Sequence, residues 1–308
     1  MSELFEIMLN SIAPIFFVVG LAAIYARRFN PDPRPLSGVV LYLFVPFLVF
    51  NGLARREIAG DEALQIVTVA FVMALLMATI GLGISRILRL DRRMESAFVL
   101  TVMLVNAANY GIPLNTFTFG TTPELAVLAE QRAIVFYVGG IIVTNTFGIF
   151  FASRGSVSAQ EAVKNVFRVP LIYAAILGLI VSMTEINLPL FIERPIEILS
   201  NAAIPGMMVL LGIQLARATV RGRMPLIALA SGVKLVAAPL LALGVAALVG
   251  LSGMPYNISV VESSMPTAVI ASVLAIQFGA DSEFVSSVIV VSTLASIVTL
   301  SILLAVLT

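Results

Sequence analysis

Long apolar runs separated by short polar connections make up most of the chain. A helix that crosses the hydrocarbon core of a bilayer needs about 20 mostly apolar residues, and ten segments approach or exceed this length. The segments are residues 6–26, 36–54, 63–88, 96–118, 131–152, 169–184, 198–216, 225–250, 257–278 and 284–306. The pattern predicts an all-α polytopic membrane protein with ten transmembrane helices and no soluble domain.

The fourth of these segments contains a stretch that disfavours an ordinary helix. It reads Leu104-Val-Asn-Ala-Ala-Asn-Tyr-Gly-Ile-Pro-Leu-Asn115. Pro113 has no backbone N–H and its ring clashes with the carbonyl four residues back, so we expect the helix to break there. Pro266 predicts a second break in the ninth segment. Two interrupted helices at corresponding places in two halves are typical of a secondary transporter whose site lies where they cross.

The positions of the prolines also suggest an internal repeat. Pro46 and Pro205 are 159 residues apart, and Pro113 and Pro266 are 153 residues apart. Five segments in each half is an odd number, so the second half would be inverted relative to the first. This predicts a first repeat over residues 1–152, a cytoplasmic connecting loop over 153–168, and an inverted second repeat over 169–308. The alternative is that these are ordinary prolines, which are frequent in membrane helices.

Lysine and arginine are distributed unevenly between the two sets of loops. Of the 18 basic residues, 13 follow odd-numbered segments, four lie on the opposite side, and Lys234 lies within a segment. Because short cytoplasmic loops carry the excess of basic residues, both termini are expected outside the cytoplasm. We therefore expect a multi-pass protein of the bacterial inner membrane.

Composition excludes several other classes of protein. The chain is 60% hydrophobic and 11% charged, far from the values of a soluble protein. It has no Cys and no His, so Ser-His and Cys-His catalytic sites and His- or Cys-ligated metal sites are absent. No basic cluster suggests nucleic acid. We expect no enzyme activity, no bound metal and no cofactor, with the lipid bilayer as the surrounding partner.

Helix ends created by the two breaks would supply binding groups. Free N–H groups at a half-helix N-terminus favour anions, and carbonyls at a C-terminus favour cations. A small organic anion is the substrate that this chemistry predicts. The expected substrate-binding residues are Asn109, Tyr110, Gly111, Pro113, Asn115, Met265, Pro266 and Thr267. The alternative for the asparagines is that they join helices or bond the freed backbone.

Glu262 lies four residues before Pro266, about one turn from the expected break. An ionisable side chain within a membrane segment is functional by default. We expect it to bind a coupling ion, Na⁺ or H⁺. Asn106, Thr144, Asn145 and Gln277 are the oxygen-bearing residues expected to complete this site. The alternative is that the ninth segment starts late and Glu262 lies in a wet mouth.

Lys234 is the basic residue inside the eighth segment. It lies about 12 Å along that helix at 1.5 Å per residue. Two readings are open. The side chain snorkels to the cytoplasmic face, or it lines the site as a charge partner of the substrate carboxylate or of Glu262.

Seven stretches together resemble the auxin efflux carrier family, in particular its bacterial malate and malonate permeases. They are residues 43–50, 106–114, 169–178, 208–216, 234–240, 265–268 and 292–300. The resemblance implies ten helices in two inverted repeats, a fold shared with bile-acid/sodium symporters, in which a glutamate ahead of the crossing binds sodium. It also implies a scaffold of segments 1, 2, 6 and 7, which is often dimeric. Segments 3–5 and 8–10 would form a transport domain that moves like an elevator.

The function that these observations favour is secondary transport of small organic anions by alternating access. Malate, malonate and auxin-like acids are the substrates implied by the resemblance. The alternative within transport is a sodium-coupled symporter of larger amphipathic anions of the bile-acid type. A passive channel is a further alternative, which counterflow exchange would oppose.

Overall fold

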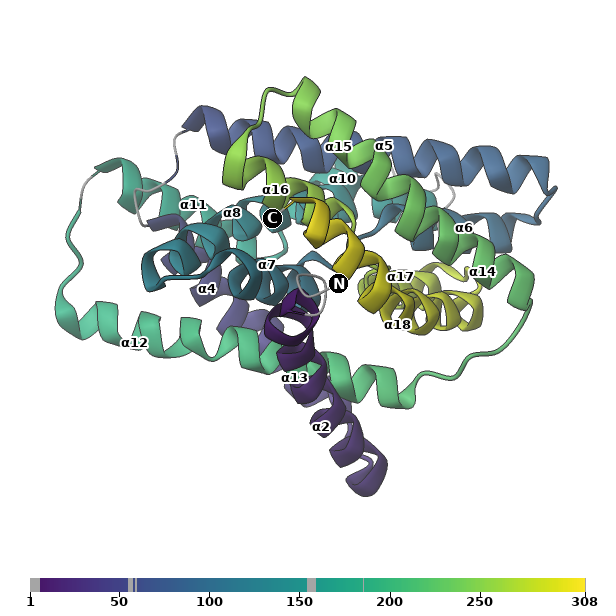
Figure 1. The fold of residues 1–308 in the computed structure, drawn as a ribbon, viewed down its shortest axis with the longest axis horizontal. Coiled ribbons are helices and arrows are strands. Elements are labelled where there is room, and N and C mark those ends of the chain that lie inside the picture. Colours follow the sequence, from purple (N-terminus) through teal and green to yellow (C-terminus); the bar gives the residue numbers. More distant parts are fainter. Residues whose placement is uncertain (1–5, 55–57, 59, 154–158, 185, 308) are drawn as a thin grey trace.

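The computed structural model describes residues 6–54, 58, 60–153, 159–184 and 186–307, and these are predominantly helical (Figure 1). Seven helices in this part of the chain are long and apolar enough to cross a membrane. They are Met8–Phe29, Pro33–Ala54, Gly60–Ile87, Pro123–Ala152, Leu190–Arg217, Met224–Leu248 and Ser282–Leu307. A shorter apolar helix covers Pro170–Thr184. The prediction of an all-helical, polytopic membrane protein is confirmed.

The helices follow one another with short connections. In chain order they are η1 (Met8–Ile12), α2 (Ala13–Phe29), α3 (Pro33–Val39), η2 (Val40–Phe44), α4 (Val45–Ala54), α5 (Gly60–Ile87), α6 (Arg92–Met103), η3 (Ala107–Gly111), α7 (Ile112–Phe119), α8 (Pro123–Val143), η4 (Thr144–Gly148), α9 (Ile149–Ala152), α10 (Ala159–Val166), α11 (Pro170–Thr184), α12 (Leu190–Asn201), α13 (Ala203–Arg217), α14 (Met224–Gly232), η5 (Val233–Ala237), α15 (Ala238–Leu248), α16 (Gly253–Ser263), α17 (Ile270–Phe278) and α18 (Ser282–Leu307). The η elements are π-helical turns, and four of them lie inside long helices.

Local signals explain several helix starts. The Asp91 side chain caps α6 by accepting from the backbone N–H groups of Arg93 and Met94 at 2.9 and 3.0 Å. Asp61 and Glu62 lie in the first turn of α5 and Arg86 in its last turn, so the charges oppose the helix dipole at both ends.

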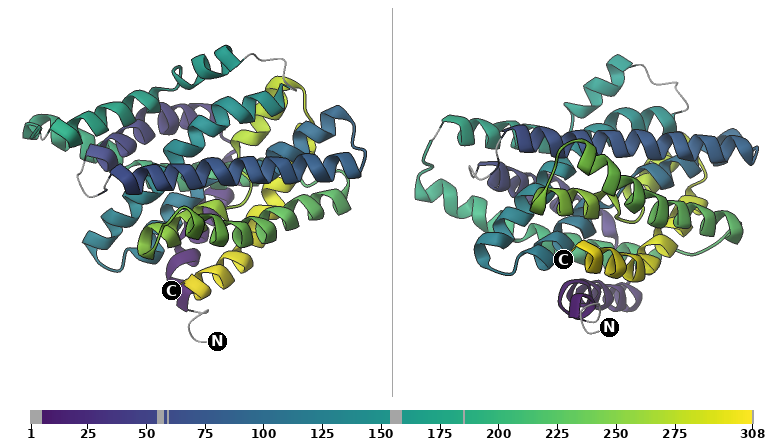
Figure 2. Two further views of the ribbon diagram at one scale, coloured as in Figure 1. Left: turned by 90° about the horizontal axis from the view of Figure 1, so that it is seen from above. Right: turned by 45° about the horizontal axis from the view of Figure 1, so that its top comes forward.

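The helices pack into two groups. In the first group α13 lies along α2, and α11 and α12 lie against α4. In the second group α5 packs on α6 and α8, α15 on α16, and α14 on α18. Figure 1 shows α5 and α15 along one side of the molecule, with α12, α13 and α2 on the opposite side. The right-hand view of Figure 2 again separates α5 from α2.

A glycine lets two helices of the first group approach closely. A methyl group at Gly212 of α13 would overlap the backbone carbonyl of Val19 in α2. Small residues permit this kind of backbone contact between membrane helices, where packing rather than water exclusion holds helices together.

The connecting segment is not entirely a loop. Residues 159–166 form α10, which packs against η4 and buries Val166. The prediction of a loop over 153–168 is therefore wrong for this part, and residues 154–158 lie outside the described residues. The packing of α10 against η4 is a tertiary contact, which hydropathy alone does not show.

Candidate functional site

Two interrupted helices meet at the centre of the molecule. The first is interrupted between α6 and η3, at residues 104–106, and the second between α16 and α17, at residues 264–269. Val105 and Thr267 form an antiparallel bridge there. The backbone N–H of Asn106 donates to the Pro266 carbonyl at 2.9 Å, and that of Ala268 donates to the Leu104 carbonyl at 3.1 Å. Each break thus pairs backbone groups that the other leaves free, as burial in a membrane protein requires.

Side chains reinforce this crossing. The Thr267 hydroxyl donates to the Thr101 carbonyl at 2.8 Å, near the end of α6. The Thr267 backbone N–H donates to the Ser292 hydroxyl of α18 at 3.3 Å. Thr267 is fully buried by these contacts. Thr267 thus links the two breaks through its own hydrogen bonds, and substrate contact by Thr267 stays a prediction.

The first break does not lie at Pro113, so that prediction is wrong. Pro113 is the second residue of α7, which continues η3 without a gap, so the helix accommodates this proline without a break. The π-helical turn η3 precedes it, and the change from π- to α-helical bonding falls at this point. The half-helices α6 and α16 end at Met103 and Ser263, 160 residues apart. Pro266, in contrast, lies inside the second break as predicted.

A cavity of about 660 Å³ lies beside the crossing, between the two groups of helices. Leu41 and Leu210 line it from the first group, and Met73, Phe136 and Leu274 from the second. Most of the lining is apolar, and the described lining residues include no Asp or Glu. Asn165 and Arg168 of the segment after α9 also line it, which places them on the side of the basic loops.

Five of the predicted amide and hydroxyl residues line this cavity: Asn106, Asn109, Thr144, Asn145 and Gln277. Asn106 is 4% exposed, and its Nδ2 has no hydrogen-bond partner among the described residues. The same holds for Oδ1 of Asn109 within that part of the chain. Asn145 differs, because its Nδ2 donates to the Ile141 carbonyl at 2.9 Å. Asn106 thus has a buried donor, and Asn109 a buried acceptor, without a partner among the described residues.

Lys234 also lines the cavity, from the π-helical turn η5. Its side chain is fully buried, and Nζ donates to the Val102 carbonyl at 3.1 Å. The reading in which Lys234 snorkels to the cytoplasmic face is therefore wrong. The turn that carries it, η5, packs against α6 and α18. The ammonium group of Lys234 therefore reaches a neighbouring helix, α6, and does not extend along its own helix toward the membrane surface.

Glu262 lies in a separate, closed environment. Its side chain is fully buried, which rules out the wet mouth as its location. Asn115 Nδ2 donates to Oε1 of Glu262 at 2.9 Å and to the Gly111 carbonyl at 3.0 Å. A methyl group at Gly111 would overlap the Glu262 carboxylate. Oε2 of Glu262 and Oδ1 of Asn115 have no hydrogen-bond partner in the described structure.

The structure regroups the predicted site residues. Asn106, Thr144, Asn145 and Gln277, expected beside Glu262, line the cavity instead. The other residues expected to bind substrate, apart from Asn109, are absent from the described cavity lining: Tyr110, Gly111, Pro113, Asn115, Met265, Pro266 and Thr267. Tyr110 is fully buried and packs edge-on against Phe16, with ring centroids 5.6 Å apart. The predicted residues thus fall into two sets: those that line the cavity, such as Asn106 and Asn109, and those that do not, which include the buried pair Glu262 and Asn115.

A partly buried ion pair joins α5 and α8, and it was not predicted from the sequence. Arg132 is 9% exposed, and its Nε lies 2.8 Å from Oε1 of Glu62. A second guanidinium nitrogen donates to Oε2 at 3.2 Å. The fifth segment was expected to start at residue 131, but α8 already starts at Pro123, after the Thr122 cap. The signal was available in the Thr-Pro cap and the apolar residues that follow it.

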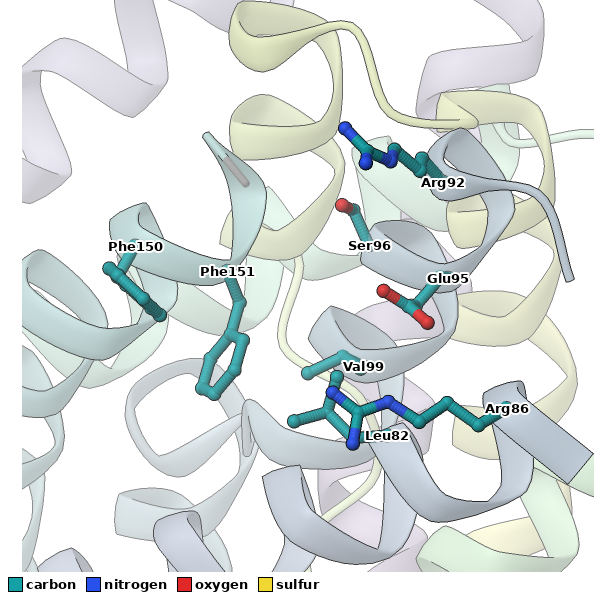
Figure 3. Close-up of a pocket in the computed structure, with 8 residues that line it drawn as sticks. All are labelled: Leu82, Arg86, Arg92, Glu95, Ser96, Val99, Phe150 and Phe151. Carbon is teal, nitrogen blue, oxygen red and sulfur yellow. The ribbon is translucent and has the colours of Figure 1, made fainter. Parts of the chain in front are cut away.

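A second cavity, of about 430 Å³, lies away from the crossing (Figure 3). Arg86 of α5 and Arg92 of α6 lie at its two ends, with Glu95 and Ser96 between them. Phe150 and Phe151 face these side chains from the opposite wall. Both arginines are exposed, so this cavity belongs to the surface.

The described residues contain no group of three or more His, Cys, Asp or Glu side chains that could hold a metal ion. Around the crossing, the chemistry available consists of amides, one carboxyl group, one ammonium group and the ends of half-helices. Such groups can bind a small ion and release it unchanged.

Comparison with known proteins gives one family for nearly the whole chain. The family described as "Membrane transport protein" matches residues 7–166 and 156–304. An uncharacterized transporter of Methanothermobacter thermautotrophicus is 28% identical over 302 residues, which cover 97% of this chain and 94% of the relative. An uncharacterized transporter of Methanocaldococcus jannaschii is 24% identical over 273 residues, covering 86% and 87%. The similarity includes both interrupted helices.

Proposed function

The chain belongs to the auxin efflux carrier family of membrane transport proteins, and from this premise we propose that it is a secondary transporter of small organic anions. The observation that carries the proposal is the crossing of two interrupted helices beside a cavity with unpaired amides. Carboxylates such as malate, malonate or auxin-like acids match this chemistry, because amides and free N–H groups bind carboxylate oxygens.

We place the anion at the cavity end of the crossing. Asn106 and Asn109 contribute amide groups there, and η3 and α17 begin at residues 107 and 270. The N-terminal ends of interrupted helices attract anions through their free N–H groups and dipoles. A site of this kind binds weakly enough to release its substrate on the opposite side.

The proposed mechanism is elevator-type alternating access. The first group of packed helices is the scaffold and the second is the transport domain, and the cavity lies between them. The proposed topology has ten spans in two inverted repeats. The protein lies in the plasma membrane, with both termini on the side opposite the cytoplasm. The cavity would then open to the cytoplasm, because Arg168 lies on its rim. The scaffold is the proposed contact of a homodimer.

Glu262 is the proposed coupling residue, and we favour a proton over Na⁺ as the coupling ion. Its Oε1 already accepts from Asn115, and its carboxylate packs directly against Gly111. A buried carboxylate without a cation is costly, and protonation removes that cost. Movement that opens this side would let the carboxyl group exchange its proton with the outside solution.

Proteoliposome uptake of labelled malate, with imposed pH or Na⁺ gradients, tests this function. We expect a pH gradient to drive uptake in wild type, and Glu262→Gln to lose that drive. Asp281→Asn is a matched control, because Asp281 caps α18 away from the crossing. Uptake of no organic anion at all would contradict the proposal.

A second candidate is a sodium-coupled symporter of larger amphipathic anions. The size of the cavity and its mostly apolar lining favour it. Competition separates the two candidates. If a bulky amphipathic anion inhibits malate uptake only weakly and a Na⁺ gradient has no effect, the small-anion proposal stands.

A further inference from the structure

Lys234 is a buried cation whose partner is a backbone carbonyl. Its Nζ lies 3.1 Å from the carbonyl oxygen of Val102, the penultimate residue of α6. Within the described residues it forms no ion pair with an acidic side chain. A buried ammonium is normally paired, because removing an unpaired charge from water is expensive. A charged ammonium group at this place therefore needs another source of negative charge.

One source is the end of the α6 half-helix. Carbonyl groups at a helix C-terminus carry a partial negative charge of roughly half an elementary charge. In carriers with interrupted helices, such ends and the unwound carbonyls beside them are where transported cations bind. Here the ammonium of Lys234 already contacts that end, and it is attached covalently to the chain.

The other source would be the transported anion. Lys234 lines the cavity together with Asn106 and Asn109, and the buried Nδ2 of Asn106, a donor, has no hydrogen-bond partner among the described residues. An ammonium group has three donors, and one of them is used on Val102. Two donors remain for a carboxylate, and charge-assisted hydrogen bonds of this type are short and strong.

We propose that Lys234 is a tethered cation of the crossing, which neutralises the carbonyl end of α6 and binds the carboxylate of the substrate. The α6 end then needs no metal ion, and the positive charge moves together with the helices that carry the anion. This inference rests on the proposed function, because it assigns the group that holds the transported anion.

The absence of cysteine from the chain makes a charge-rescue experiment available. Lys234→Cys would be the single thiol of the protein. We expect this variant to raise the KM for malate uptake about ten-fold or more, because hydrogen bonds to charged groups contribute about 1.5–3 kcal/mol. Reaction with 2-aminoethyl methanethiosulfonate restores an ammonium group and should lower the KM again. Ethyl methanethiosulfonate adds similar bulk without charge and should not.

Two controls separate charge at this position from other effects. Arg194→Gln removes an exposed cation of α12 that is not among the described cavity-lining residues, and it should change the KM less than two-fold because exposed charges interact weakly. Met73→Cys places a thiol at another buried position of the lining, and its aminoethyl adduct should not improve anion affinity.

The outcomes are distinguishable. If the neutral reagent restores uptake as well as the charged one, Lys234 has a packing role and the inference is overturned. An unchanged KM in Lys234→Cys overturns it too, while leaving the proposed function intact. Lys234→Gln, which can still donate to Val102, should show the same KM increase if the cysteine variant fails to assemble. Wild-type protein without any anion uptake would refute the proposed function itself.

Discussion

The two sides of the crossing differ in access and in charge. On the cavity side, Asn106, Asn109 and Lys234 line a space of about 660 Å³, and Asn106 and Asn109 each have a buried polar atom without a partner among the described residues. On the other side, Glu262 and Asn115 are fully buried and bonded to each other. The cavity side therefore borders open space, whereas Glu262 and Asn115 are enclosed by other side chains. Substitutions on the two sides should change different kinetic parameters.

The largest effect is expected from Gly111→Ala. The added methyl group would overlap the Glu262 carboxylate, so either the carboxylate or η3 must move. Overpacking of this kind costs about 1–3 kcal/mol. We expect uptake to be abolished and the thermal transition of the purified protein to fall. Gly244→Ala in α15 is the matched control, because nothing in the described structure lies within 4 Å of the added carbon. Equal behaviour of the two variants would contradict the close packing of Glu262.

Asn115→Ala should reduce gradient-driven uptake without changing the KM for the anion. The substitution removes the donor to Oε1 of Glu262, and an unpaired buried acceptor costs about 1–3 kcal/mol. Asn115 is not among the described residues of the cavity lining, so anion binding should be preserved. We expect a decrease of about ten-fold in the maximal rate. A rise in KM with an unchanged rate would instead place Asn115 in the anion site.

Asn109→Ala should have the opposite kinetic effect. Asn109 lines the cavity, and its amide Nδ2 is the atom that can donate to a carboxylate. Loss of one hydrogen bond between the amide and the anion should raise the KM about ten-fold, because hydrogen bonds to charged groups contribute about 1.5–3 kcal/mol. Thr68→Ala on α5 is the control, since its hydroxyl bonds only its own helix at Leu64. Concentration-dependent uptake into proteoliposomes measures both variants.

The sequence predicts the helical class well because hydropathy and length are sufficient for it. The starts of α5 and α18 lie within three residues of the expected ones. Pro266 was a sound signal for the second break, since proline cannot continue a helix. The first break had no such signal. Leu104 and Val105 are compatible with a helix, and the bridge to residues 266–268 determines where α6 ends.

The side-chain groupings depended on facts that hydropathy does not contain. Glu262 and Lys234 both lie within apolar segments, but only the packing of neighbouring helices determines which of them borders the cavity. The ion pair of Arg132 was missed for a related reason. Its helix, α8, begins at Pro123, whereas the apolar run suggests a start at residue 131. Residue types were thus predictable near the crossing, whereas their division between its two sides was not.

The smallest effect is expected from Pro113→Ala, although Pro113 first drew attention to this helix. If proline caused the break, alanine would restore a continuous helix and abolish uptake. In the structure the break lies at residues 104–106 and is held by the Asn106–Pro266 and Ala268–Leu104 hydrogen bonds. Alanine at the first turn of α7 leaves those bonds in place, so uptake should change less than about two-fold. Thr267→Val is the informative partner, because it removes the hydroxyl that bonds the Thr101 carbonyl at the crossing. If uptake is lost in Pro113→Ala and kept in Thr267→Val, the break depends on proline and not on the bridge between the two helices.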